Sequence, residues 1–201
     1  MFAWNTNPLA SAPRQQELRA AFARDDLFTV AIDCFPTDTT AYADIVLPAA
    51  SFLEFDDITF SYFHLHMGAQ AKVNSPVGES LPNQEIFRRL ATAMGFDEPA
   101  LHEDDASLIA GMMTQMSPGF DFAELKRRGY FALGDEPMIM HDSLKFETPS
   151  GRIEIASAAA EEMGLPRTPL ANVDPVPAAG RLRLLTPASK WRLNDSYSND
   201  P

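Results

Sequence analysis

A strand, a helix and a second strand follow one another within the first 33 residues, and this pattern constrains the fold more than any other feature of the chain. Residues 2–5 are a short apolar segment, residues 14–24 place apolar side chains at helical spacing, and residues 27–33 are β-branched and apolar. Such a unit makes the two strands parallel, with a right-handed crossover between them. We therefore expect an α/β protein with a parallel, Rossmann-like sheet.

Polar side chains follow both of these strands at the point where each strand ends. Asn5, Thr6 and Asn7 come after the first strand, and Asp33 ends the second. Open parallel sheets bind ligands outside the carboxyl ends of their strands, so these residues are expected to face one crevice. A plain cap or turn role for Asp33 is the alternative, because Asp often follows strands for backbone reasons alone.

The remaining chain continues the α/β pattern and then changes character. An apolar segment at 44–54 is ended or kinked by Pro48, residues 58–73 alternate as one or two strands, and residues 82–95 have the pattern of a helix. We expect four segments: an α/β segment at 1–100, a helical excursion at 101–145, a β-hairpin with a Pro-rich linker at 146–180, and a final segment at 181–201 that begins with a strand. Both ends of the sequence look cut.

Charge and composition exclude several partners. Sixteen Lys and Arg residues against 28 Asp and Glu residues give a formal net charge of −12, so binding to nucleic acid is not expected. No apolar stretch approaches the roughly 18 residues of a membrane-spanning helix, and residues 1–15 lack the pattern of a signal peptide. The single cysteine, Cys34, suits a reducing compartment, so a cytoplasmic location is expected, with the periplasm left open.

Local signatures of common enzyme classes are absent from the sequence. It contains no Walker sequence, no GxGxxG, no GxSxG elbow and no HExxH. His64 and His66 would share one face of a strand, which is compatible with metal ligation, but surface or core-rim histidines are the favoured interpretation. Packing is favoured over reactivity for Cys34, and a helix cap over a calcium loop for the acidic residues 103–105.

The end of the chain adds cations and hydroxyls to this inventory. Residues 181–195 contain amides, hydroxyls and the cations Lys190 and Arg192, a mixture suited to a base with phosphates. An ordinary solvated strand end is the alternative for these two cations.

Five motifs in one order make the chain resemble the molybdopterin oxidoreductases of the dimethyl sulfoxide reductase family. The motifs lie at 5–8, 28–54, 75–91, 146–154 and 184–199. The most specific is D-x-F-x-T-x-T-A-x-x-A-D-x-V-L-P, which begins at Asp33 and which this chain departs from mainly at Thr40. The resemblance implies the later portion of a catalytic subunit, in which an α/β cofactor-binding domain is followed by the start of a C-terminal β-barrel domain at 181–201.

The resemblance also implies a cofactor and the residues that bind it. The cofactor would be molybdenum with molybdopterin guanine dinucleotide, and Asp33 would accept hydrogen bonds from the N1 and N2 donors of one guanine. Thr37 would brace the same loop, Asn5 and Asn7 would line the crevice, and Asn83 would be a second nucleotide contact. The pterin and phosphates would be contacted by Thr186, Ser189, Lys190, Asn194, Ser196 and Asn199.

The parts that the family needs for chemistry are not found in this sequence. Relatives often have Lys where Phe55 stands here, so no role is carried over to that position. Cys34 lies inside a nucleotide-binding motif and is not the molybdenum ligand, and one cysteine cannot hold a [4Fe–4S] cluster, which would lie elsewhere in the parent. We therefore expect a fragment of a molybdenum oxidoreductase that is inert alone, with no catalytic or metal-ligating residue of its own.

The expected partners are the rest of the same polypeptide and electron-transfer subunits. Two other functions remain open at this point. One is a stand-alone nucleotide-binding or interaction module without catalysis, and the other is an acidic α/β hydrolytic domain.

Overall fold

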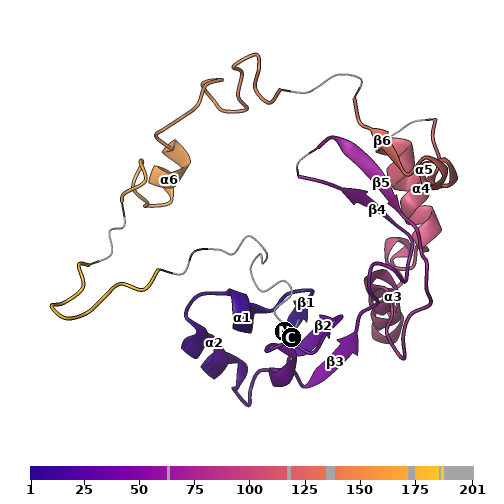
Figure 1. Cartoon of the computed structure of the whole chain (residues 1–201), viewed down its shortest axis with the longest axis horizontal. Coiled ribbons are helices and arrows are strands. Elements are labelled where there is room, and N and C mark those ends of the chain that lie inside the picture. Colours follow the sequence, from indigo (N-terminus) through magenta and orange to yellow (C-terminus); the bar gives the residue numbers. More distant parts are fainter. Residues whose placement is uncertain (63, 117–118, 135–138, 172–174, 186, 188–201) are drawn as a thin grey trace. The chain divides into compact units, whose positions relative to one another are not determined.

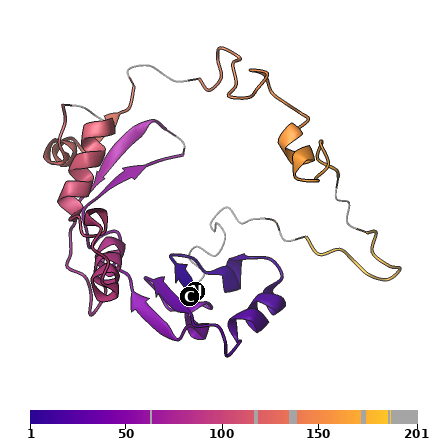
Figure 2. The ribbon, with the colours of Figure 1, turned by 180° about the vertical axis from the view of Figure 1, so that it is seen from behind.

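A computed structural model describes residues 1–62, 64–116, 119–134, 139–171, 175–185 and 187. The described residues divide into two compact units, one within 1–134 and one within 139–187, and each is described by itself. The main elements are labelled in Figure 1, and Figure 2 shows the chain from behind.

A three-stranded parallel sheet forms the first part of the larger unit. Its strands β1 (Phe2–Trp4), β2 (Val30–Asp33) and β3 (Ile45–Pro48) lie in that order, with β2 in the centre. Trp4 pairs with Ile32, and the last residue of β2 pairs with the last residue of β3. The expected α/β fold with a parallel sheet is therefore confirmed.

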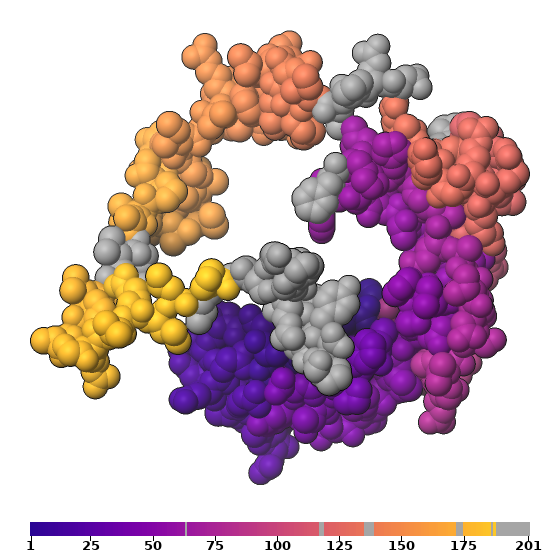
Figure 3. Space-filling model, viewed as in Figure 1, coloured from indigo at the N-terminus to yellow at the C-terminus, as the bar shows by residue number. Residues whose placement is uncertain are grey.

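Two helices connect β1 to β2 and contact each other. Helix α2 (Gln15–Phe22) was expected from its spacing, and its Phe22 is buried. Helix α1 (Pro8–Ser11) follows β1 after three residues, because Pro8 suits the first helical position and Leu9 is fully buried. In the space-filling view, residues 1–50, coloured indigo to purple, form one closely packed body (Figure 3).

Helix α3 (Asn83–Met94) packs on the central and third strands. Its Ile86 joins Ile32 and Ala49 in one buried cluster, and each buried isoleucine contributes about 1.5–3 kcal/mol of hydrophobic stabilisation. An isolated parallel bridge between Ala49 and Leu81 brings the chain alongside the continuation of β3 just before α3 begins. Two short 3₁₀ turns complete this part of the chain. The turn η1 (Thr40–Tyr42) lies between β2 and β3, and η2 (Pro99–Leu101) follows α3.

A second, antiparallel sheet follows in the same unit. It consists of β4 (Asp57–Phe60), β5 (His66–Gln70) and β6 (Tyr130–Ala132), with β5 in the centre. Helices α4 (Asp105–Met116) and α5 (Phe122–Arg128) supply the rest of its core. That core consists of Ile58, Met67, Ile109, Met113, Leu125 and Phe131.

The smaller unit contains one short helix, α6 (Ala158–Glu162), whose N-cap Ser157 accepts a hydrogen bond from Ala160. The turn expected within 144–157 forms, with Gly151 N donating to Thr148 O at 2.9 Å, but no strand flanks it in this described segment. An isolated two-stranded ribbon is only marginally stable in water, which explains the difference from the expected hairpin.

The expected β-barrel start at 181–201 falls mostly outside the described residues and stays a prediction, as do the four segment boundaries. Among the described helices, none is both long enough and apolar enough to cross a membrane.

Candidate functional site

The carboxyl edge of the parallel sheet collects several of the predicted residues. Asn5 follows β1 and donates its backbone N–H to Ile32 O at 2.9 Å, which holds it beside the end of β2. Asp33 ends β2. Because the bridge between Ala49 and Leu81 is parallel, Asn83 emerges at the same edge. Asn5, Asp33 and Asn83 therefore leave the sheet on one side, as the sequence predicted for the first two.

The Asp33 carboxylate is half-buried and only partly engaged. Its Oδ1 accepts a hydrogen bond from Phe35 N at 3.2 Å, which closes a turn at the strand end. Within the described part of the chain, no donor is found for its Oδ2 and no cation pairs with it. The strand end thus presents one carboxylate oxygen in a fixed orientation.

Asn7 is a buried brace between the first two loops. Its Oδ1 accepts from the backbone N–H of Thr39 at 3.1 Å and from the Thr39 hydroxyl at 2.8 Å. Asn7 is 8% exposed and Thr39 is 1% exposed, so these bonds are shielded from water. Asn7 was predicted to line the crevice, but its Oδ1 already accepts two hydrogen bonds from Thr39.

Thr37 takes part in a second, local brace. The Thr40 hydroxyl accepts from Thr37 N at 2.7 Å and donates to Thr37 O at 2.8 Å, while the Thr37 hydroxyl accepts from Thr40 N at 3.2 Å. These bonds fix the turn between β2 and η1. They place Thr37 in the loop that follows Asp33.

Glu54 is a third brace, which sequence reasoning missed. It is 6% exposed, and its two carboxylate oxygens accept from Ser51 N at 2.7 Å and Val77 N at 3.1 Å. These bonds link the segment after β3 to the loop that leads into α3. The sequence gives little sign of this role. Glu54 ends an apolar segment, and of its two hydrogen-bond partners only Ser51 is close along the chain.

Asn83 and its neighbour carry the other unusual feature of this edge. They begin α3, and the oxygens Asn83 Oδ1 and Gln84 Oε1 are buried without a hydrogen-bond partner among the described residues. A buried acceptor left unsatisfied costs about 1–3 kcal/mol. Both residues as a whole are only partly buried, so a change of side-chain rotamer would let either oxygen meet a donor.

Cys34 lies beside the site and is chemically quiet. Its Sγ contacts Ala50 O at 3.5 Å, and burial, followed by the negative charges of Asp33 and Glu54, raises the pKa of the thiol. The thiol stays protonated near neutral pH and is a poor nucleophile or metal ligand. The structure thus argues against a reactive role, but the packing role expected from the sequence is not seen, because Cys34 is exposed.

The acidic residues 103–105 have a structural role, which Asp104 supplies. Asp104 accepts from Ser107 N at 2.9 Å just before α4, and this backbone bond, with one from the Ser107 hydroxyl, lowers the pKa of the Asp104 carboxyl. This geometry is that of a helix cap. Over the described ranges, no group of three or more His, Cys, Asp or Glu side chains is arranged to hold a metal ion.

The remaining predicted contacts lie outside the described residues. They are Thr186, Ser189, Lys190, Asn194, Ser196 and Asn199, together with the cation Arg192. Their roles stay predictions.

Comparison with known proteins shows which family this part of the chain resembles. The family model described as molybdopterin oxidoreductase matches residues 1–93. A probable oxidoreductase of Bacillus subtilis, YoaE, is 38% identical over 173 residues, which cover 84% of this chain and 25% of the relative. A protein of Halobacterium salinarum, described as a putative catalytic subunit of dimethyl sulfoxide reductase, is 26% identical over 217 residues, covering 100% of this chain and 25% of the relative.

A solved structure agrees with the sequence comparison. Acetylene hydratase from Pelobacter acetylenicus matches with a TM-score of 0.64 and 26% identity, over 85% of this chain and 23% of that protein. The chain thus spans about a quarter of the length of the relatives that it matches. The resemblance predicted from the motifs is confirmed: residues 1–93 match the molybdopterin oxidoreductase family, and the relatives and the solved structure are similar over a larger part of the chain.

Proposed function

We propose that the chain is part of a molybdenum-dependent oxidoreductase and that the carboxyl edge of its parallel sheet binds the guanine end of a molybdopterin guanine dinucleotide. The observation that carries this proposal is the half-buried Asp33 carboxylate, which is fixed through Oδ1 and open at Oδ2. Family membership supplies the molybdopterin cofactor. The guanine form of the cofactor is what the family resemblance implies, and the chemistry of the edge is compatible with it.

Guanine fits this edge because it presents two adjacent donors. Its N1–H and N2 amino group can both donate to one carboxylate, and such bidentate pairs discriminate between bases by about 1–3 kcal/mol. The orphaned oxygens of Asn83 and Gln84 add acceptors at the same edge. Adenine has no donor at N1, so it would leave one of these acceptors unpaired.

The chain's own residues would bind and orient the cofactor. The bound molybdenum–pterin group would supply the two-electron chemistry of the whole enzyme. Asp33 would hold the base, while the Asn7–Thr39 and Thr37–Thr40 bonds keep the surrounding loops in one conformation. The partners would be the rest of the polypeptide and electron-transfer subunits, and any [4Fe–4S] cluster would lie outside this chain, whose one cysteine cannot ligate it.

The proposal is tested by comparing guanosine, inosine and adenosine monophosphates as ligands in saturation-transfer NMR. We expect the chain to bind the guanosine nucleotide in preference to the inosine nucleotide, which lacks the N2 amino group, and to prefer both to the adenosine nucleotide. Asp33→Ala should remove this order of preference. Asp25→Ala is the matched control, since Asp25 is exposed and precedes β2 on its amino-terminal side. Equal binding of all three nucleotides to the unmodified chain would contradict the assignment.

A further inference from the structure

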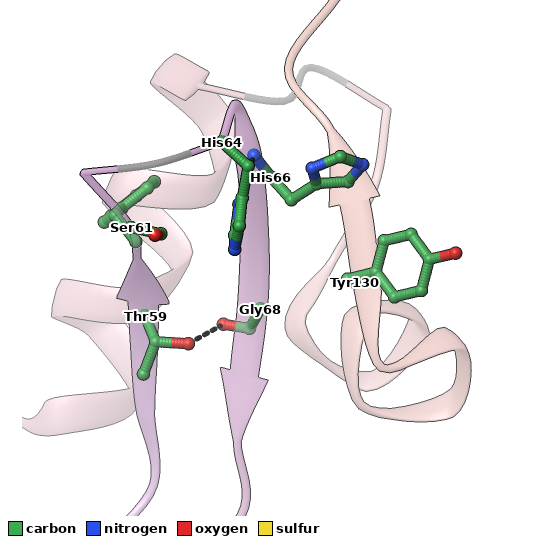
Figure 4. Close-up of a pocket in the computed structure, with 7 residues that line it drawn as sticks. Thr59, Ser61, His64, His66, Gly68 and Tyr130 are labelled. Atoms are coloured by element: carbon green, nitrogen blue, oxygen red, sulfur yellow. Dashed lines mark hydrogen bonds between the residues drawn. The ribbon is translucent and has the colours of Figure 1, made fainter.

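A pocket of about 410 Å³ on the antiparallel sheet gathers two imidazoles and a phenol. His66 begins β5, His64 lies two residues before it, and Tyr130 begins the neighbouring strand β6. Figure 4 shows the three rings together at one end of this sheet, with Thr59 bonded to Gly68 beside them. These residues are separate from the carboxyl edge of the parallel sheet and have no role in the function proposed above.

The two imidazoles are spaced as they would be around one metal ion. Their ring centres are 5.1 Å apart and their planes cross at 76°. With a metal–nitrogen bond of about 2.0 Å and about 1.1 Å from a ring nitrogen to the ring centre, each ring centre would lie roughly 3.1 Å from the ion. Two rings separated by a nearly tetrahedral angle then have centres about 5 Å apart, which matches the observed spacing.

The contacts around the pair leave room for such an ion. Among the described residues, one hydrogen bond ties the rings to the backbone, from His66 N to His64 Nδ1; it is long at 3.3 Å, so a metal ion competes there with a weak donor. The Tyr130 ring centre is 5.3 Å from that of His66, so its ring forms one wall of the pocket, while its hydroxyl points away from the pair (Figure 4). Solvent can complete the coordination, because His64 is exposed.

The imidazoles of the other two histidines of the chain each contact another group of the protein. His102 Nε2 lies 2.7 Å from Phe96 O, and His141 stacks on Phe146 with ring centres 4.6 Å apart. Neither pairs with a second imidazole. They provide matched controls for substitutions at the pair.

The chemistry of the pair selects the class of ion. Two neutral nitrogen ligands do not suit Ca²⁺ or Mg²⁺, which require oxygen ligands. Imidazole favours the late first-row divalent ions, among which Cu²⁺ binds most tightly. We propose that His64 and His66 chelate one such ion, Cu²⁺ with the highest affinity, in place of the surface role expected from the sequence.

The test is a Cu²⁺ titration of the purified 201-residue chain against glycine as a competitor, followed by electron paramagnetic resonance of the copper-bound chain. We expect one tight ion per chain, with spectral couplings from two imidazole nitrogens. His64→Asn should weaken binding on the order of tenfold or more, because it removes one arm of the chelate. His66→Asn should do the same, with an unchanged circular dichroism spectrum.

The control variants decide between this site and adventitious copper binding. His102→Asn and His141→Asn should leave the tight site unchanged. The inference is overturned if either control weakens binding as much as His64→Asn, or if the His64→Asn/His66→Asn double variant binds Cu²⁺ as tightly as the unmodified chain. Nucleotide binding does not enter this measurement, so its outcome is independent of the function proposed above.

Discussion

Replacing Asp33 with Asn should change which purine the chain prefers. The backbone N–H of Phe35 donates to Asp33 Oδ1, and the same N–H would hold the amide oxygen of an Asn in that place. The amide NH₂ group would then occupy the position of the open Oδ2. The substitution therefore exchanges one acceptor for a donor without changing the shape of the side chain.

The size of the effect follows from the hydrogen bonds that change. Guanine would face the new NH₂ group with one of its own donors, so it would lose a charge-assisted bond that is worth about 1.5–3 kcal/mol. That loss corresponds to a fall in affinity of roughly 10-fold to 150-fold. Xanthine carries a carbonyl oxygen in place of the N2 amino group. Its N1–H can therefore donate to the amide oxygen of Asn, while its carbonyl oxygen accepts from the amide NH₂ group.

The assay compares guanosine and xanthosine monophosphates on the unmodified chain and on Asp33→Asn, with Asp25→Asn as the charge-matched control. We expect the preference to invert in Asp33→Asn and to be unchanged in Asp25→Asn. An Asp33→Asn chain that still prefers the guanosine nucleotide by the original ratio would refute the reasoning, since Asp33 would then not read the base.

Three further predictions concern the fold. Asn7→Ala should lower the free energy of unfolding by about 1–3 kcal/mol in urea titrations, because it leaves buried donors of the loop after β2 unpaired; a change below about 0.5 kcal/mol would contradict the brace. Gly95→Ala should lower the free energy of unfolding by about 1 kcal/mol, because Gly95 ends α3 with φ +71°, a backbone conformation that alanine disfavours. Gly111→Ala, inside α4, should raise it by about 0.5–1 kcal/mol. Equal effects of the two substitutions in urea titrations would contradict this reasoning. The guanidinium groups of Arg127 and Arg128 lower the pKa of Glu124 from 4.5 to about 2. The contribution of the Glu124 carboxylate to stability should therefore be complete above pH 4.5 and be lost as the pH falls toward 2. A titration midpoint near 4.5 for the Glu124 carboxyl in carbon-13 NMR would contradict this prediction.

The sequence was sufficient to predict that β1 and β2 are parallel, because both strands are short and apolar and a helix of the right length separates them. Strand β6 could not be predicted in this way, since Tyr130–Ala132 gains its place only by pairing with β5 and by burying Phe131 in a core drawn from distant segments. Likewise, the turn within 144–157 follows from Gly151, but strands need neighbours that local pattern does not supply.

The candidate site shows the same division between local and distant information. Asp33 was predicted because it ends a strand, and a strand end is visible along the chain. The engagement of Asn7 with Thr39 was not, because the partner lies 32 residues away and both side chains are common turn formers. A polar residue at a strand end can thus either bind a ligand or hold a loop, and only the hydrogen-bond partners distinguish the two.

That division explains how the edge can be specific. Asn7, Thr37 and Glu54 direct their hydrogen-bonding oxygens to the protein and fix three loops, whereas Asp33 keeps one oxygen open. A ligand that meets loops already held in place loses less conformational entropy on binding. Since the braces bond to the backbone or to each other, they should affect all purine nucleotides alike, while Asp33 should decide among them. Asn7→Ala is therefore expected to weaken guanosine and inosine nucleotides by the same factor, and Asp33→Asn to change their ratio.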